Sequence, residues 1–237
     1  MLTAVSYLLY RFRWVFCQLD TLQHCSPPNI RQFLNELPET LDETYERILK
    51  GINRAQKAHA HRLLQCLTVA VRPLRVEELT ELLAFDFQAS SEEGIPKLKE
   101  DWRWDNQEEA LLWTCSSLIA IVPHGSTRVV QFSVKEYLVS PRLARTRGDV
   151  SRFHIRLEPA HTILAQACLG TLLRLDDHAG NNGAQGFPLV KYAAQHWVDH
   201  ARFEKVSSRV QDGTDDLFDT SKPYFVAWLQ VHDIDED

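Results

Sequence analysis

The chain has 237 residues, of which 44% are hydrophobic and 24% charged, as is typical of a soluble globular protein with one or two domains. Its net charge of -6 disfavours contact with a phosphate backbone, so nucleic acid is not the expected partner. The 5 cysteines are widely spaced and include no C-x-x-C pair, which argues against a disulfide framework or a zinc site and favours a reducing, cytoplasmic location.

The first segment, MLTAVSYLLY, is apolar but ends at Arg11, about half of the ~20 residues that a membrane span needs. It also lacks the basic region and the A-x-A site of a signal peptide, so we expect no membrane insertion. Apolar residues continue at helical spacing through the arginines, and we expect this stripe to face the core. The stripe contains Val5, Leu8, Leu9, Phe12, Val15, Phe16, Leu19 and Leu22.

A short helix is predicted next, between the prolines at 27–28 and Pro38, because proline interrupts helical hydrogen bonding. Its apolar residues are Ile30, Phe33, Leu34 and Leu37.

The segment LPETLDETYERIL, 37–49, places several carboxylates close together, which raises the alternatives of an acid/base or cation site and of a helix start. Thr40 followed by Glu43 predicts a capping box, in which each side chain accepts a free amide hydrogen. We therefore interpret the carboxylates as helix-start and solvent-facing groups. The carboxylates are Glu39, Asp42, Glu43 and Glu46, and the apolar face opposite them contains Leu41, Tyr45, Ile48, Leu49 and Ile52. Residues 1–52 are thus predicted to be a helical segment.

Residues 53–141 show the order of a winged helix, three helices followed by a β-hairpin. The first two helices are separated by a turn at RPLR, and a third is expected to be capped by Asp105 with Glu108. SLIAIV and RVVQF, separated by PHGST, predict the hairpin. The helical stripes are Ala60, Leu63, Leu64, Leu67, Ala70 and Val71; Val76, Leu79, Leu82 and Leu83; and Leu111, Leu112 and Cys115.

An insertion, FQASSEEGIPKLKEDWRW, is predicted to be a surface loop that folds back so that Trp102 and Trp104 can pack. Residues 142–237 are predicted to form an antiparallel array of helices, with Pro159, Pro188 and Pro223 near helix starts. The fold class is therefore mainly α: a helical segment, a winged helix and a helical array.

The candidate site motifs in the chain match known catalytic and ligand-binding patterns poorly. Gly180, Gly183 and Gly186 fit neither the dinucleotide nor the phosphate-loop fingerprint and indicate a linker. His196 and His200 have the i, i+4 spacing of metal ligands but lack the glutamate of H-E-x-x-H, and His59 with His61 is a weaker pair. No serine lies in a G-x-S-x-G elbow and no cysteine lies in a catalytic signature. We predict no enzyme activity, no catalytic residue, no cofactor and no metal.

DNA binding is the alternative that a winged helix raises. The third helix, within DNQEEALLWTCSS, contains no lysine or arginine, and only Asn106 and Gln107 are plausible base readers. Arg72, Arg75 and Arg128 are the basic residues that would contact a DNA backbone. The acidic third helix therefore disfavours DNA.

Ordered blocks from Phe12 to Leu229 resemble the region that follows the nucleotide-binding core in fungal NACHT proteins of the STAND class, many of which carry ankyrin repeats. These blocks are FRWVFCQLDTL, LPETLDETYERIL, RPLRVEELTELLAFDF, ALLWTCSSLIAI, VKEYLVS and PLVKYAAQHWVDHA. The central part is similar to the GPI inositol-deacylase winged helix domain. The resemblance implies a signalling switch in which the winged helix holds an ATPase core closed.

The chain departs from that family pattern, since it has neither a phosphate loop nor an acidic Mg²⁺-binding strand. Relatives have Phe-Ser-His before V-K-E, whereas here Phe132-Ser133 continues directly into Val134-Lys135, without the histidine that the resemblance assigns to the nucleotide phosphate. We expect a non-catalytic regulatory module that binds proteins, either a full-length NACHT relative or itself. A DNA-binding winged helix and an incomplete gene product are the alternatives.

Overall fold

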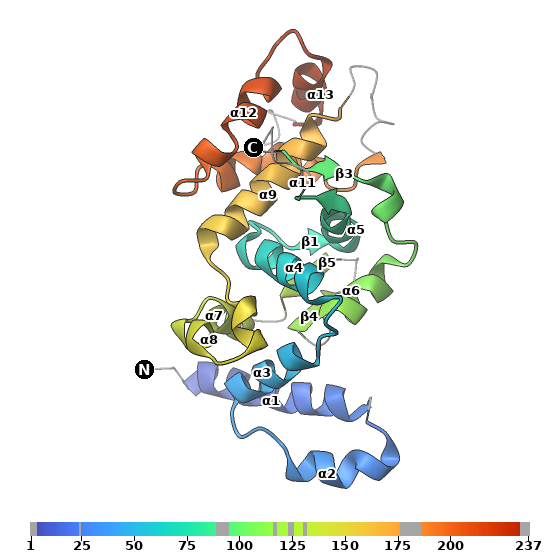
Figure 1. Cartoon of the computed structure of the whole chain (residues 1–237), viewed down its shortest axis with the longest axis vertical. Helices are drawn as coiled ribbons and strands as arrows, with labels where there is room; N and C mark the ends of the chain where they lie inside the picture. The colour runs from blue at the N-terminus through green and yellow to red at the C-terminus, as the bar shows by residue number, and fades with distance from the viewer. Residues whose placement is uncertain are drawn as a thin grey trace.

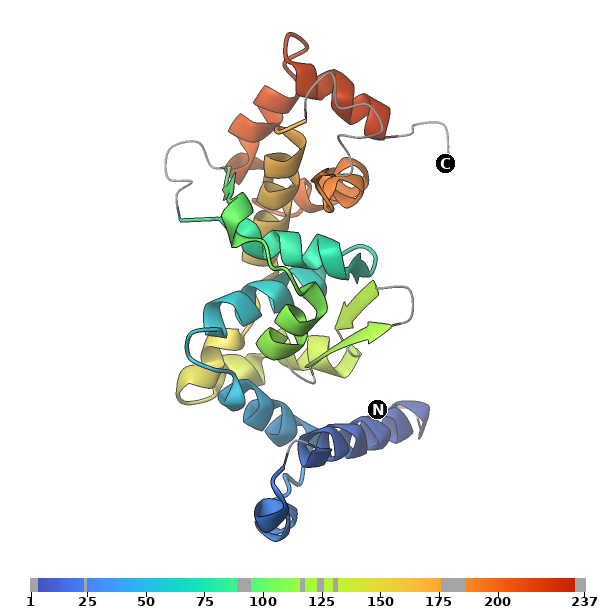
Figure 2. The ribbon, with the colours of Figure 1, turned by 90° about the vertical axis from the view of Figure 1, so that its right-hand side faces the viewer.

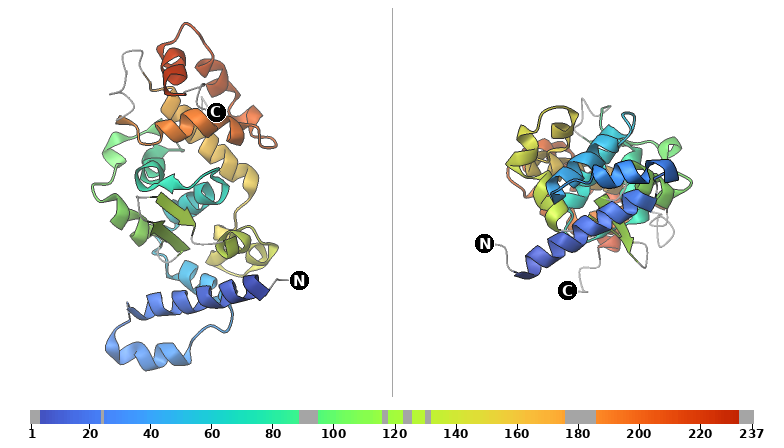
Figure 3. Two further views of the ribbon diagram at one scale, coloured as in Figure 1. Left: turned by 180° about the vertical axis from the view of Figure 1, so that it is seen from behind. Right: turned by 90° about the horizontal axis from the view of Figure 1, so that it is seen from below.

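The computed structural model describes residues 4–23, 25–88, 95–115, 118–122, 126–129, 132–175 and 186–232. Within these ranges the chain is mainly helical, as predicted, and forms an elongated stack (Figure 1). The first helices lie at one end of the stack and the last two at the other, as the view from behind also shows (Figure 3). One cluster of buried side chains extends from Cys17 to Ala227. The proposed domain boundaries at residues 52 and 141 stay predictions.

The N-terminal part contains α1 (Ala4–Gln23), the 3-10 turn η1 (Pro27–Asn29), α2 (Ile30–Asn35) and α3 (Leu41–Gly51). The predicted capping box of α3 is confirmed. The Thr40 hydroxyl accepts a hydrogen bond from the Glu43 N–H at 3.2 Å, and the Glu43 carboxylate accepts one from the Thr40 N–H at 3.3 Å. Leu41, Tyr45 and Leu49 are buried on the opposite face, so the carboxylates do mark a helix start rather than a cleft.

The orientation predicted for α1 is wrong in its described side chains. The large apolar residues expected in the core are exposed: Phe12, Val15, Phe16 and Leu19. The buried face is mostly polar and contains Arg13, Cys17 and Gln18. Gln18 contributes to this orientation, because its amide donates to the Thr44 hydroxyl at 3.0 Å and accepts from the Arg47 guanidinium at 2.6 Å. Hydrogen bonds to α3 therefore hold the polar side of α1 inward.

The winged helix is built from α4 (Lys57–Val69), β1 (Leu74–Arg75), α5 (Val76–Glu81) with its 3-10 extension η2 (Leu82–Ala84), α6 (Gln107–Cys115), β4 (Ile119–Val122) and β5 (Ser126–Val129). The predicted hairpin is confirmed: β4 and β5 are antiparallel, with Ile119 opposite Val129, and lie beside α6 (Figure 2). The predicted RPLR turn supplies a third strand, since β1 pairs with β5. The second strand was expected to cover residues 128–132. It instead begins earlier, at Ser126, which pairs with Val122. Phe132 begins the next helix, α7 (Phe132–Leu138).

The insertion is more ordered than the predicted surface loop. Part of it forms β3 (Lys97–Leu98), which pairs with β2 (Phe85–Asp86), and the 3-10 turn η3 (Glu100–Trp102) follows. Trp104 packs as expected, with its ring centroid 6.4 Å from that of Trp113. Trp102 does not, since 44% of it is exposed.

The C-terminal part contains α8 (Pro141–Arg145), η5 (Asp149–Phe153), α9 (Leu157–Leu172), α11 (Val190–Ala201), η7 (Ser207–Arg209), α12 (Gln211–Leu217) and α13 (Pro223–Val231). Helix α9 packs against both α4 and α11 and so joins the winged helix to the helical array. Helix α12 was not predicted, because glycine and aspartate have low helix propensity. Burial of Leu217 and close packing of Gly213 against Ile95 compensate. No described helix is both long and apolar enough to cross a membrane.

Candidate interaction surfaces

Helix α6 occupies the reading position of the winged helix, and its inner face is apolar. That face contains Ala110, Leu111, Thr114 and Cys115. Because an α-helix turns about 100° per residue, the intervening Leu112 and Trp113 point outward. They are 49% and 63% exposed, so the predicted burial of Leu112 is wrong. Sequence reasoning missed Trp113, although the same spacing could have placed it on the outer face.

A surface pocket of about 780 Å³ lies at the start of α6. Trp104 and Trp113 form its aromatic wall, and Asp105, Glu108 and Glu109 surround it with carboxylates. The two ring planes meet at 74°. The pocket therefore combines one exposed ring, Trp113, and one partly buried ring, Trp104, with negative charge.

Two of the residues considered as DNA contacts, Asn106 and Arg72, are engaged within the protein. Asn106 caps α6, because its side-chain oxygen accepts from the Glu109 N–H at 3.3 Å and its amide donates to the Glu109 carboxylate at 2.8 Å. The cap is thus one residue later than the predicted Asp105–Glu108 pair. Arg72 binds Glu78 through two hydrogen bonds of 2.8 and 2.7 Å. Arg75 is exposed.

The side chain of Arg128, the remaining basic candidate, lies outside the described side chains. Gln107 is half-buried at the first position of α6.

His200, one of the proposed metal-ligand pair, is fully buried in a hydrogen-bonded network. Its Nε2 lies 2.8 Å from the Tyr192 hydroxyl, and its Nδ1 lies 3.0 Å from Nδ1 of His161. Burial, followed by the neighbouring His161, lowers the pKa of His200 to about 4. A neutral imidazole whose two ring nitrogens are both hydrogen-bonded stabilises the core and has no nitrogen left for a metal.

The remaining candidate histidines are His196, His59 and His61, and they differ in their surroundings. Nδ1 of His196 lies 3.2 Å from the Asp199 carboxylate, on the outer side of α11. Burial lowers the pKa of both His59 and His61, and the ring of His61 stands edge-on to Phe153. Across the described residues, no group of three His, Cys, Asp or Glu side chains is arranged to hold a metal.

The thiols and the glycine segment offer no reactive centre in the described part of the chain. Burial raises the pKa of Cys66 to about 12 and also raises the pKa of Cys115 and of Cys168, so these thiols stay protonated and are poor nucleophiles. Gly180 and Gly183 lie outside the described residues.

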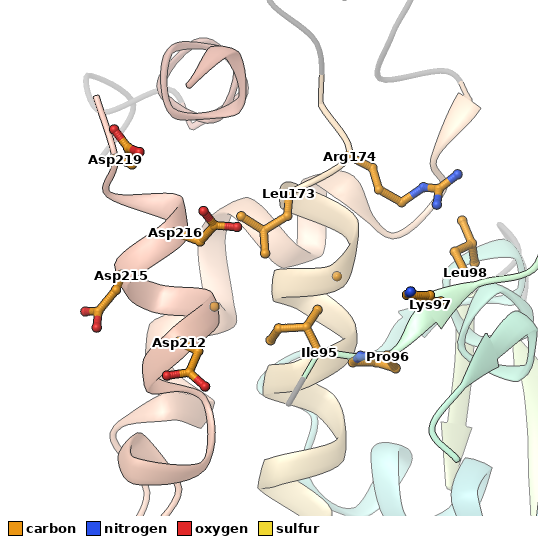
Figure 4. Close-up of a pocket in the computed structure, with 12 residues that line it drawn as sticks. Ile95, Pro96, Lys97, Leu98, Leu173, Arg174, Asp212, Asp215, Asp216 and Asp219 are labelled. Atoms are coloured by element: carbon orange, nitrogen blue, oxygen red, sulfur yellow. The ribbon is translucent and has the colours of Figure 1, made fainter. Parts of the chain in front are cut away.

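A second pocket, of about 810 Å³, lies between α9, α12 and β3 (Figure 4). Asp212, Asp216 and Asp219 line its α12 side, and Lys97 and Arg174 line the other. Ile95 lies between the two helices at its base.

Comparison with known proteins supports the central fold. Residues 45–149 match the family model described as GPI inositol-deacylase, winged helix domain. A curated relative, Azaphilone pigments biosynthesis cluster protein L of Monascus ruber, is 33% identical over 214 residues, which cover 86% of this chain and 44% of that protein. The chain therefore spans less than half the length of this relative. No solved structure matches the chain. The three helices and hairpin, together with the family match, show that residues 45–149 contain a winged helix domain similar to that of GPI inositol-deacylase.

Proposed function

We propose that the chain is a non-catalytic regulatory and protein-interaction module that derives from a NACHT-type STAND signalling NTPase and acts in the cytoplasm without that enzyme's nucleotide-binding core. The exposed stripe of α1 carries the proposal. Phe12 is 70% exposed, Phe16 52% and Leu19 55%, and Val15 between them is 44% exposed. A contiguous apolar surface on one helix face is typical of a protein contact.

The partner that we propose for this stripe is a full-length NACHT relative. This choice follows from the resemblance of the ordered sequence blocks to that class. The hydrogen bonds of Gln18 also support the proposal, because they attach the polar side of α1 to α3 and leave its apolar side exposed.

DNA binding receives less support. The sequence of α6, QEEALLWTC, has no lysine or arginine, and Asn106 is engaged as a cap. Carboxylates at the start of this helix would repel phosphate.

The proposal is tested by measuring binding of the purified chain to a full-length NACHT relative by calorimetry. Substituting Phe12→Glu together with Phe16→Glu is expected to weaken binding at least about tenfold, since each places a charge in an apolar contact. Leu157→Glu is the matched control, because Leu157 is an exposed leucine, 44% accessible, at the start of α9.

Circular dichroism confirms that each variant folds, and light scattering measures its mass. A strictly monomeric chain that does not bind the relative would disprove the proposed interaction through α1. A dimer broken by the α1 variant would replace the relative by a second copy as the partner, and steep salt-dependent binding to random duplex in fluorescence anisotropy would favour DNA.

A further inference from the structure

Trp104 and Trp113 form an open aromatic corner on the outer side of α6. The ring planes are inclined at 74° with centroids 6.4 Å apart, so the two rings form adjacent walls rather than a closed stack. Trp113 is 63% exposed and Leu112 beside it is 49% exposed. Large side chains in this position lose hydrophobic free energy unless something covers them.

The charge around the corner has one sign. Asp105, Glu108 and Glu109 line the same pocket, and none of them forms an ion pair with a described residue. Arg103, which is adjacent in sequence, is already held by Glu81 through hydrogen bonds of 3.0 and 2.6 Å. The position next to the helix N-terminus explains why carboxylates are tolerated there, but it does not explain the exposed rings.

We propose that this pocket binds a basic segment of a protein partner, with an arginine or lysine side chain seated against Trp104 and Trp113. A cation above an indole ring is attracted by the negative ring face, and carboxylates at the rim add complementary charge. The volume of about 780 Å³ accommodates more than one side chain, so neighbouring residues of an extended segment fit as well. The inference rests on the proposed function as a protein-binding module.

The pocket and the α1 stripe are separate surfaces. The pocket is formed by the loop before α6 and by α6 itself, whereas the stripe lies on α1 at the end of the stack (Figure 1). Substitutions on α1 can therefore remove the apolar contact without affecting cation binding at α6, and substitutions at α6 can do the reverse. The reading position of the winged helix is thus assigned to a basic protein segment instead of DNA.

The test is a calorimetric titration of the full chain with an eight-residue arginine peptide at low and moderate salt. The control ligand is the same peptide with citrulline in place of arginine, because citrulline keeps the side-chain shape and removes the charge. We expect the arginine peptide to bind, the citrulline peptide to bind at least tenfold more weakly, and the affinity to fall with added salt.

Variants separate the pocket from general attraction to an acidic protein. Trp113→Ala is expected to weaken binding at least tenfold, whereas Trp102→Ala, an exposed tryptophan outside the pocket, leaves it unchanged. Glu108→Gln is expected to weaken binding several-fold, whereas Glu77→Gln, an exposed acid on α5, does not. Circular dichroism shows whether each variant keeps its fold, and Glu108→Gln retains the complete tryptophan corner.

Absence of arginine-peptide binding, equal losses from Trp113→Ala and Trp102→Ala, or preferential binding of duplex DNA would each overturn the inference. The inference would also be overturned if tetramethylammonium displaced the peptide completely and bound with the same affinity, because the site would then be one for a small cation. Loss of peptide binding with intact binding through α1 would leave the proposed function standing. Loss of α1-dependent binding with an intact peptide response would refute only the partner assigned to the stripe.

Discussion

The hydroxyl of Tyr192 accepts a hydrogen bond of 3.2 Å from the backbone N–H of Val71, which lies 121 positions earlier in the chain. The same hydroxyl lies 2.8 Å from Nε2 of His200. Nδ1 of His200 in turn lies 3.0 Å from Nδ1 of His161. This chain of hydrogen bonds joins the turn after α4 to α11 and α9.

Removing the hydroxyl in Tyr192→Phe should lower the free energy of unfolding by about 1–3 kcal/mol, because Val71 N–H and His200 Nε2 lose their partner. Tyr137→Phe is the control: Tyr137 is 4% exposed, and its hydroxyl forms no hydrogen bond with the described residues. Urea denaturation measures both. Equal losses would show that the Tyr192 hydroxyl has no special role.

The pKa of His200 is lowered to about 4 from an ordinary value of 6.5, first by burial and then by His161. A base with a lowered folded-state pKa binds fewer protons when folded, so its stability contribution is complete above pH 6.5 and declines as the pH falls toward 4. The loss between pH 7 and pH 4 is on the order of 3 kcal/mol.

His200→Gln isolates this effect, because glutamine can accept from Tyr192 and donate to His161 without titrating. Denaturation midpoints of both proteins between pH 7 and pH 4 provide the measurement. We expect the advantage of the wild-type protein over the variant to shrink as the pH falls. A difference that stays constant with pH would contradict the assignment.

Glu78→Gln should destabilise the protein by about 2–3 kcal/mol. Its carboxylate, with a side chain only 3% exposed, binds Arg72 twice and accepts the Arg75 N–H at 2.7 Å, so the change leaves a partly buried guanidinium without its counter-charge. Glu46→Gln is the matched control, since its partner Lys50 is 60% exposed. That surface pair should contribute less than about 0.5 kcal/mol in the same denaturation experiment.

Two glycines should respond oppositely to alanine. At Gly51, in the last turn of α3, an added Cβ meets nothing within 4 Å, so Gly51→Ala should gain about 0.4–1 kcal/mol through reduced backbone freedom in the unfolded chain. At Gly170, in α9, a Cβ would lie 3.0 Å from both the Pro96 carbonyl oxygen and the Phe85 ring. Gly170→Ala should therefore lower the melting temperature, and a rise in both variants would show that the α9 contact is loose.

Local patterns predicted several elements correctly because the interactions that decide them lie within a few residues. Thr40 and Glu43 cap α3 through bonds between residues three apart. Two β-branched runs separated by a turn-rich segment also predicted the pairing of β4 with β5. The apolar stripes of α4 and α5 were identified for the same reason, since a helix places residues three and four apart on one face. Val71, assigned to the first stripe, is an exception, because it lies beyond the end of α4 and is exposed.

The orientation of side chains at the candidate surfaces depends on contacts with residues that are distant in the sequence. The stripe of Phe12 and Phe16 had the spacing of a core face, but the bonds from Gln18 to Thr44 and Arg47 hold the opposite side of α1 against α3. Trp113 became half of an aromatic corner because α6 packs through Leu111 and Cys115 and because Trp104 returns beside it from the insertion.

The sequence by itself therefore determined the mainly helical class, the winged-helix order and the capping box of α3, because these depend on short-range hydrogen bonds and periodicity. The tertiary structure alone decided which face of α1 is exposed, how Tyr192 reaches Val71 and where the two tryptophans meet. Those outcomes depend on contacts between residues tens of positions apart, and a pattern within one helix carries no information about which of its faces finds a partner.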